Sequence, residues 1–193
     1  MNANNNTIRT FIACPIAKPI SQRIVQVQDQ IKTYKWKIRW VPASNIHLTL
    51  SFLGDIHSSM QQKIIHAINP LINAQKPFEF TLGNLGVFPN ARRPNVLWIG
   101  LTGDIGPLVT FQKHLQDALK PLGFSGDKRN FKVHLTLGRI KGPVPKNQLA
   151  EVLCMDISGE MQSFICDRIV FYQSKLSSKG AKYFILHDWK FDL

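Results

Sequence analysis

A tetrapeptide that contains a histidine and a threonine occurs twice in the chain. His-Leu-Thr-Leu begins at His47, in NIHLTLSF, and again at His134, in KVHLTLGR. Successive side chains of a strand point to opposite faces, so each histidine shares a face with the threonine two residues on, and the leucines share the other face. An imidazole can accept or donate a proton, and a hydroxyl can donate a hydrogen bond. Each copy therefore predicts half of a catalytic site on a strand that its leucines anchor.

Two such pairs that face each other suit in-line displacement at a phosphodiester. One neutral histidine takes a proton from the attacking oxygen, and the other histidine, protonated, gives a proton to the leaving oxygen. Histidine suits both tasks because its ordinary pKa is about 6.5. The hydroxyls of Thr49 and Thr136 would donate to the non-bridging phosphate oxygens. This chemistry requires no metal ion, and a repeat kept only for packing would not explain why the polar face recurs.

The segments around the two motifs follow the same order in both halves of the chain. In the first half, helices are predicted from Pro19 and after Ser59, between three strands at 7–16, 46–54 and 77–88. The same order of elements recurs in the second half at an offset of 87 residues, which is the distance from His47 to His134. Helices are predicted there from Pro107 and Pro145, and strands at 95–101, 131–139, 164–172 and 182–188.

This repeated order predicts an α+β fold that arose by internal duplication. Two lobes related by a pseudo-two-fold axis would each hold a mainly antiparallel sheet with helices packed on its outer face. A cleft would lie between the lobes, and the two polar motif faces would meet across it. The chain 1–193 is predicted to form a single bilobal domain, with repeats at approximately 7–90 and 95–190 and a junction in FPNARRPN.

The charge balance favours an anionic partner. The 193 residues include 24 Lys and Arg against 12 Asp and Glu, a formal net charge of +12. Such an excess favours nucleic acid or phosphorylated ligands. The hydrophobic share of 44% and the charged share of 19% are ordinary for a globular protein. No apolar run approaches the roughly 20 residues of a membrane helix, so no membrane partner is expected.

The cysteines and the known short motifs exclude several classes of protein. Cys14, Cys154 and Cys166 are an odd number, widely spaced and without a CxxC pair, which argues against a disulfide framework and a thiolate metal site. They are expected to be small buried residues of a cytoplasmic protein. No P-loop, GxGxxG or HExxH pattern occurs, which argues against NTP-driven chemistry, dinucleotide binding and zinc proteolysis.

At the two motifs the chain resembles the 2H phosphoesterase superfamily, which is named for a pair of His-x-Thr motifs. Within it, the sequence is most similar to the bacterial and archaeal RNA 2′,3′-cyclic phosphodiesterase family, historically called 2′-5′ RNA ligases. The resemblance covers nearly the whole chain. It is carried by RTFIA, WVPASNIHLTLSFLGD, GVFPNARRPNVLWIGL, FKVHLTLGR and SKLSSKGAKYFIL. One departure is Val133, where many relatives have a proline.

The resemblance implies hydrolysis of RNA 2′,3′-cyclic phosphate ends to a 2′-phosphate, without a cofactor. It implies that His47 gives a proton to the leaving 3′ oxygen and that His134 accepts a proton from water. Thr49 and Thr136 would hold the phosphate, and Arg139 would assist them. The partners implied are RNA with 2′,3′-cyclic phosphate ends or small nucleotide cyclic phosphates, bound by a monomer. The residues alone do not distinguish acid from base, because the two copies are locally almost identical.

Strict alternation raises one difficulty and makes one further prediction. It places Arg139 on the apolar face of its strand, so a bulge at Gly138 or a twist at the strand end is needed. In the first copy it places Ser51 on the polar face and Phe52 on the apolar face.

Other residues could contribute to binding, although a structural role is favoured for most. Core packing is expected for most of four aromatic residues that could instead stack a base, namely Phe11, Phe52, Phe88 and Trp98. The basic segments ARRPN and GDKRN could contact an RNA backbone, and Lys132 shares the face of His134. Structural or surface roles are expected for the remaining histidines, which are His57, His66, His114 and His187.

Two other functions remain open. A non-catalytic RNA-binding module would bind RNA in a salt-sensitive way without turnover, although four intact motif side chains argue against it. A ligase would join RNA halves through a 2′-5′ linkage, because ligation is the reverse of opening a cyclic phosphate by a hydroxyl.

Overall fold

The computed structural model describes residues 6–73, 75–126, 131–157, 163–178 and 180–192. The first half of the chain contains β1 (Thr7–Pro15), α1 (Lys18–Lys32), β2 (Ile38–Trp40), the 3-10 turn Ala43–Asn45, β3 (His47–His57), α2 (Met60–Ile72) and β4 (Phe78–Phe88). The second half contains β5 (Val96–Gly103), α3 (Ile105–Leu119), the 3-10 turn Lys120–Leu122, β6 (His134–Ile140), α4 (Lys146–Leu153), β7 (Phe164–Cys166), β8 (Arg168–Ser177) and β9 (Gly180–Lys190).

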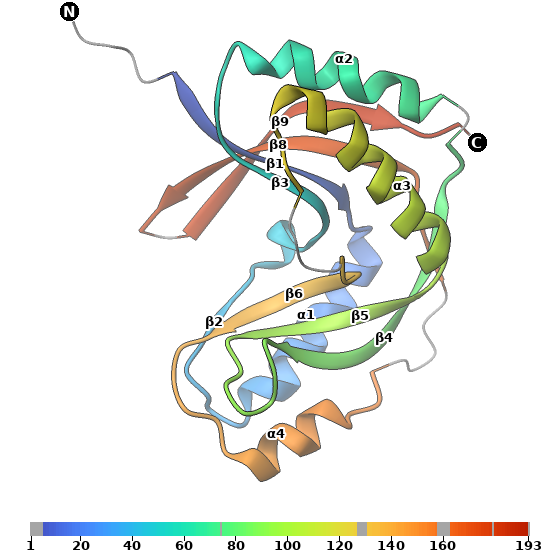
Figure 1. Ribbon diagram of the computed structural model, residues 1–193. Helices are drawn as coiled ribbons and strands as arrows, with labels where there is room; N and C mark the ends of the chain where they lie inside the picture. The colour runs from blue at the N-terminus through green and yellow to red at the C-terminus, as the bar shows by residue number, and fades with distance from the viewer. Residues whose placement is uncertain (1–5, 74, 127–130, 158–162, 179, 193) are drawn as a thin grey trace, which may run out of the picture.

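The strands form one curled antiparallel sheet that is narrow in its middle (Figure 1). Its order is β7-β4-β5-β6-β3-β1-β8-β9, with β2 paired to β6. The central pair, β3 with β6, is joined at Leu48 and Leu135 alone, whereas β1 and β3 pair along their whole length. The sheet therefore divides into two lobes at the β3–β6 contact, and the predicted α+β bilobal fold is confirmed.

Each lobe takes strands from both halves of the chain. From the first half, β4 pairs with β5 of the second half, and β8 of the second half pairs with β1 of the first. The segment 164–172, predicted as one strand, is interrupted at Asp167. Its two parts serve different lobes, because β7 pairs with β4 and β8 pairs with β1.

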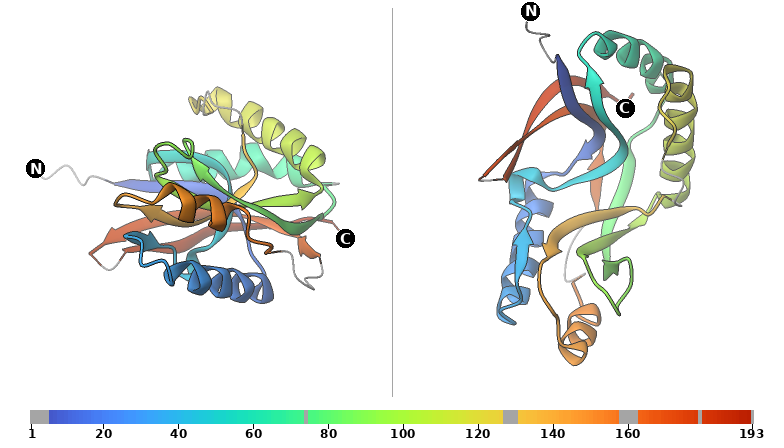
Figure 2. Two further views of the ribbon diagram at one scale, coloured as in Figure 1. Left: turned by 90° about the horizontal axis from the view of Figure 1, so that it is seen from below. Right: turned by 60° about the vertical axis from the view of Figure 1, so that its left-hand side comes forward.

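The helices cover the two lobes (Figure 2). Helices α2 and α3 lie side by side and contact β3, and α4 contacts β4 in the other lobe. The apolar face predicted for α1 is confirmed, since Ile20, Ile24, Val27 and Ile31 are all buried. In the part of the chain that the structure describes, no helix is both long and apolar enough to cross a membrane.

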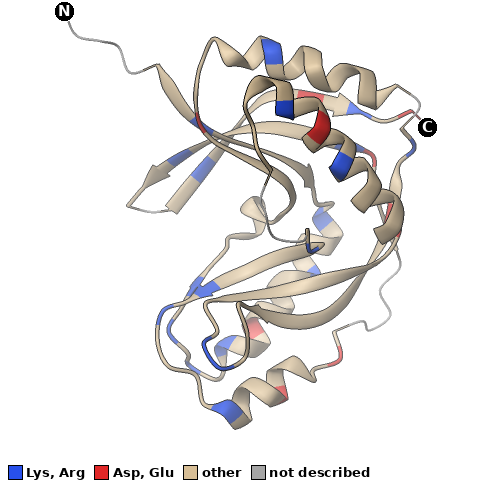
Figure 3. Cartoon of the chain, viewed as in Figure 1, with Lys and Arg blue, Asp and Glu red and all other residues tan. Residues whose placement is uncertain are grey.

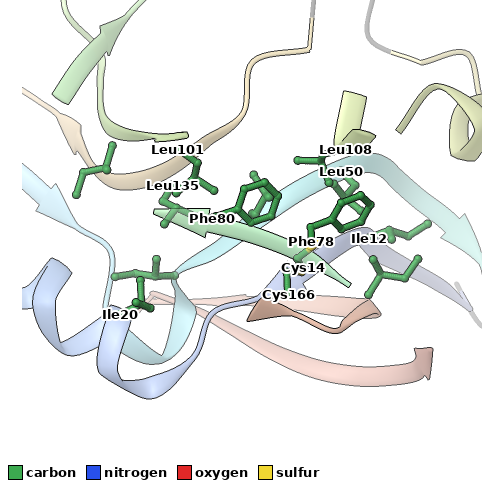
Figure 4. Close-up of a cluster of buried hydrophobic side chains, with 14 of the residues drawn as sticks. Ile12, Cys14, Ile20, Leu50, Phe78, Phe80, Leu101, Leu108, Leu135 and Cys166 are labelled. Atoms are coloured by element: carbon green, nitrogen blue, oxygen red, sulfur yellow. The ribbon is translucent and has the colours of Figure 1, made fainter. Parts of the chain in front are cut away.

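The hydrophobic core runs through both lobes and anchors both motif strands (Figure 4). The four motif leucines, Leu48, Leu50, Leu135 and Leu137, are buried as predicted. Cys14 and Cys166 are also buried and meet in this core. Cys154 is exposed after the end of α4, so the prediction of a buried residue is wrong there.

Candidate active site

The two motif strands run antiparallel and meet at their first leucines. Because Leu48 pairs with Leu135, the same register places His47 opposite Thr136 and Thr49 opposite His134. Both leucines are buried, so the four polar side chains share the opposite face of the sheet. The histidines occupy diagonal corners of this square, and diagonal neighbours across a strand pair are about 7–8 Å apart. The register thus brings two imidazoles and two hydroxyls together at the junction of the lobes.

A cavity of about 430 Å³ opens over this face. Four of the five predicted site residues line it: His47, Thr49, Thr136 and Arg139. His134 is not in the lining, although it lies in the same strand as Thr136, two residues before it. The two histidines are close enough for the charge of His134 to lower the pKa of His47.

The lining is basic. It includes Arg9, Arg39 and Arg139, and it includes no acidic side chain from the described ranges. Arg39 and Arg139 are direct neighbours in the β2–β6 pair, where two like charges repel each other. Figure 3 shows further lysines and arginines on the β8–β9 hairpin and at the β2–β6 edge. A cavity of this charge attracts an anion.

Both imidazoles are held in the same tautomer by the same local bond. The Nδ1 of His47 lies 2.7 Å from the carbonyl oxygen of Asn45, and the Nδ1 of His134 lies 2.6 Å from that of Lys132. A carbonyl oxygen only accepts, so each Nδ1 carries the hydrogen and donates it. The Nε2 of each neutral ring is therefore free to accept a proton, and it becomes a donor when the ring is charged.

Aromatic rings pack against each histidine. The ring centroid of His47 lies 4.8 Å from that of Phe11 and 5.3 Å from that of Tyr183. His134 lies 4.9 Å from Phe88 and 6.1 Å from Trp98. Phe11 is buried but also lines the cavity, and Phe88 and Trp98 are partly buried against His134.

This packing changes the acidity of the imidazoles. Burial lowers the pKa of His47 to about 4, against the opposing effect of its bond to Asn45 and with a smaller lowering from the charge of His134. Burial likewise lowers the pKa of His134, against the effect of its bond to Lys132. Lowered pKa values favour neutral rings at pH 7 in the free protein, and a bound anion would raise both pKa values.

A bulge in β6 brings Arg139 into the cavity. Leu97 pairs with Gly138 and Trp98 pairs with Thr136, so Leu137 is an extra residue opposite β5. Leu137 and Gly138 are both buried, and the exposed Arg139 returns to the face of His134 and Thr136. The predicted bulge at Gly138 is confirmed.

The glycine at this bulge has no room for a side chain. A Cβ on Gly138 would lie 2.5 Å from Cγ2 of Ile38 and 3.2 Å from the carbonyl oxygen of Arg39. We expect Gly138→Ala to lower the free energy of unfolding by about 1–3 kcal/mol, as overpacking does. Gly106→Ala, where a Cβ meets nothing within 4 Å, is the matched control and should leave it unchanged or raise it. Urea denaturation measures both, and equal stabilities would contradict the steric argument.

A second bulge follows the first motif and overturns one prediction. Ile12 pairs with Ser51 and Ala13 pairs with Thr49, so Leu50 is an extra residue opposite β1. The alternation shifts by one residue there, and Phe52 is 72% exposed and lines the cavity. The prediction of Phe52 on the apolar face is therefore wrong. His47 and Phe52 have the same spacing as His134 and Arg139, so the two bulges are equivalent.

The other candidates lie outside the cavity lining. Lys132 is exposed, with its Nζ 5.7 Å from the ring centroid of Phe88. Arg92 and Arg93 are exposed in the turn between β4 and β5, and residues 127–130 of GDKRN lie outside the described ranges. The remaining histidines lie at the surface or contact residues that are close to them in the sequence; they are His57, His66, His114 and His187. No group of three or more His, Cys, Asp or Glu side chains that could hold a metal ion occurs among the described residues.

The cavity residues that were not predicted from the sequence include Arg9, Arg39 and Tyr183. Arg9 is two residues before Phe11 in β1, and alternation along this strand could have placed both on the cavity face. Arg39 lies in a strand of three residues, too short to show a period. Tyr183 packs against His47 from β9, and nothing in its local sequence distinguishes it from its neighbours.

Comparisons with known proteins agree with this geometry. The family model described as LigT like Phosphoesterase matches the chain twice, at residues 15–98 and 99–183. The RNA 2′,3′-cyclic phosphodiesterase of Methanocaldococcus jannaschii is 30% identical over 94% of this chain and 100% of its own length. The protein of the same name from Methanothermobacter thermautotrophicus is 28% identical over 91% of this chain and 95% of its own length.

A solved structure shows the same fold. E. coli LigT in complex with 3′-AMP superposes with a TM-score of 0.79 at 22% sequence identity, over 97% of this chain and 99% of that one. The double match along the sequence and the relatives that align over nearly their full length support the same family assignment. The chain belongs to the LigT-like phosphoesterase family, as its paired His-x-Thr strands indicated.

Proposed function

We propose that this protein hydrolyses 2′,3′-cyclic phosphate at RNA ends to a 2′-phosphate, by general acid–base catalysis between His47 and His134 and without a metal ion. The observation that carries the proposal is the pair of diagonal imidazoles, each anchored through Nδ1, beside a cavity lined by three arginines. The relatives that carry the name RNA 2′,3′-cyclic phosphodiesterase support this choice of substrate.

The arrangement suits in-line displacement. The Nε2 of His134 would take a proton from water as the water oxygen forms a bond to phosphorus. The bond from phosphorus to the 3′ oxygen breaks, and the Nε2 of protonated His47 gives that oxygen its proton. The hydroxyls of Thr49 and Thr136 donate to the non-bridging oxygens, and Arg139 adds positive charge. Each proton transfer contributes typically about 10²–10⁴-fold to the rate.

The cyclic phosphodiester would itself make the acid available. It carries a negative charge at every working pH, and a negative charge beside an imidazole raises its pKa. At pH 7 the neutral form of both histidines is therefore favoured when the cavity is empty. When the cyclic phosphate is bound, the histidine that faces the leaving oxygen can hold a proton. In the alternative assignment the roles of His47 and His134 are exchanged. The local hydrogen bonds are the same in both assignments, so only kinetic measurements distinguish them.

The pH dependence tests this acid–base pair. The competent free enzyme carries one proton on the two histidines, and it loses that proton at the higher of their two pKa values. Because burial lowers both pKa values, we expect kcat/KM to be maximal between about 4 and about 6.5. Above that range it should fall by about tenfold per pH unit. Initial rates from pH 4 to 9 measure this, and a plateau that extends to pH 8 would contradict it.

The experiment that tests the function uses an oligonucleotide with a 2′,3′-cyclic phosphate end in EDTA. We expect complete conversion to the 2′-phosphate, identified by its resistance to a 3′-phosphate-specific phosphatase. Loss of activity in EDTA that a divalent metal restores would exclude the metal-independent mechanism. Salt-sensitive binding without turnover would instead identify an RNA-binding module. When a 5′-hydroxyl RNA is added, a joined product with a 2′-5′ linkage would identify ligation.

A further inference from the structure

Two glutamines are buried in the core, one on each side of the motif strands. Gln28 of α1 is 3% exposed and Gln112 of α3 is 5% exposed. Apart from Thr10, they are the only buried polar or charged side chains among the described residues. A buried amide costs free energy unless it is hydrogen-bonded, and an apolar residue of the same size would pack at these positions without that cost. Each buried amide is therefore expected to have a specific hydrogen-bond partner.

Each glutamine donates to the carbonyl of a bulged leucine. The Nε2 of Gln28 lies 3.0 Å from the carbonyl oxygen of Leu137 and 2.9 Å from that of Val41. The Nε2 of Gln112 lies 3.2 Å from the carbonyl oxygen of Leu50. Leu50 and Leu137 are the extra residues of the two bulges, and they are separated by the same offset as His47 and His134. The two bonds thus have equivalent acceptors in the two halves, although the two donors are 84 residues apart.

The bonds also cross between the halves. Gln28 belongs to the first half and holds the motif strand of the second, and Gln112 belongs to the second half and holds the motif strand of the first. A bulge leaves a residue out of the regular ladder, and a buried carbonyl that loses its partner is costly. The carbonyl of Leu137 also accepts from the backbone N–H of Val41, 2.8 Å away, so the Gln28 amide is its second donor. At both bulges a glutamine amide bonds the residue after which the alternation shifts.

This shift decides which side chains enter the cavity. Without the bulge in β6, alternation would put Gly138 on the cavity face and turn Arg139 toward the core. Without the bulge in β3, Phe52 would turn inward in the same way. Arg139 and Phe52 both line the cavity, each five residues after its histidine.

We propose that Gln28 and Gln112 are positioning residues for the catalytic cavity. Gln28 holds the bulge that presents Arg139, and Gln112 holds the bulge that presents Phe52. The inference rests on the proposed phosphodiesterase function, since Arg139 acts there on the phosphate. It assigns to two residues that lie outside the cavity a share in binding and transition-state stabilisation.

A double-mutant cycle tests the link between Gln28 and Arg139. Gln28→Met keeps the length of the side chain and removes the donor, and we expect it to lower kcat/KM for the cyclic-phosphate oligonucleotide by about tenfold or more. In the Arg139→Ala background the same substitution should change kcat/KM by less than about twofold, because contacting or linked residues are not additive. Full additivity of the two substitutions would overturn the proposal.

The crossed cycle supplies the matched control. Gln112→Met should keep its full effect in the Arg139→Ala background and lose it in the Phe52→Ala background. Asn69→Leu removes a part-buried bond, the one from the Trp189 indole 2.8 Å away, and should lower stability while leaving kcat/KM unchanged. If Gln28→Met does not fold, Gln28→Asn, whose shorter amide withdraws from Leu137, takes its place in the same cycle.

The outcomes separate this inference from the function on which it rests. Wild-type protein that does not hydrolyse the cyclic phosphate would overturn the proposed function. Active wild-type protein with additive cycles, or with a loss of activity that follows only the folded fraction measured by circular dichroism, would overturn the role of the glutamines alone.

Discussion

Replacement of either motif histidine by asparagine lowers kcat by about 10²–10⁴, because each substitution removes one proton transfer. Asparagine can still donate to the carbonyl at Asn45 or Lys132, so the strand keeps its local bond while the Nε2 is lost. Single-turnover rates with a 2′,3′-cyclic-phosphate oligonucleotide measure the loss in His47→Asn and His134→Asn. The matched control is His66→Asn on α2, whose imidazole also bonds a backbone carbonyl, at 2.8 Å, and which should keep wild-type rates.

The same two variants decide which histidine is the acid. A phosphodiester with an aryl leaving group departs without needing a proton, so it makes the acid dispensable and leaves the base essential. We expect His47→Asn to recover most of its activity on such a substrate and His134→Asn to remain inactive. The reverse pattern would exchange the two roles, and near-wild-type activity of both variants on the cyclic phosphate would exclude the mechanism.

Replacement of Arg139 by alanine lowers kcat/KM by about 10²–10³, the usual cost of removing a group that stabilises developing negative charge. Arg139 lies on the same strand face as His134 and Thr136, and none of the ion pairs between described residues involves it. Its charge is therefore available to the phosphate. Because a guanidinium can donate two parallel bonds and an ammonium cannot, Arg139→Lys should restore only part of the loss.

Arg168→Ala is the control for the loss of one positive charge. Arg168 lies 3.2 Å from Asp188 on the β8–β9 hairpin and does not line the cavity. We expect its removal to change kcat/KM by less than about twofold, in keeping with the small contribution of an exposed ion pair. If Arg139→Ala and Arg168→Ala have equal effects at two salt concentrations, Arg139 contributes only to the overall field of the protein.

The positions of the motif side chains could be predicted from the sequence because their pattern is local. The alternation of His47, Leu48 and Thr49 assigns each side chain to a face, and the second copy repeats it. The position of Arg139 could also be predicted. Strict alternation would turn its side chain toward the core, and a bulge at Gly138 returns it to the face of His134. The exposed position of Phe52 could not be predicted, because the bulge at Leu50 depends on β1 and on Gln112, which are far away in the sequence.

The way the lobes are assembled was also beyond the sequence pattern. Strand pairing depends on contacts between distant segments. The residue pattern of a single strand therefore does not show that β4 pairs with β5 or that β8 pairs with β1. Asp167 looks like one polar residue inside a strand, and only the different partners of β7 and β8 show that the strand ends there. Arg39 enters the cavity from β2, which has three residues and no period to read.

The exchange of strands between the halves has a consequence for synthesis of the protein on the ribosome. When β1 and β3 emerge, β1 has a free edge that is occupied only after β8 has been made, near the end of the chain. An unpaired edge can join another chain, and pairing across so long a loop is slow. The lobe that holds the first motif is therefore complete only when β8, close to the end of the chain, has been made.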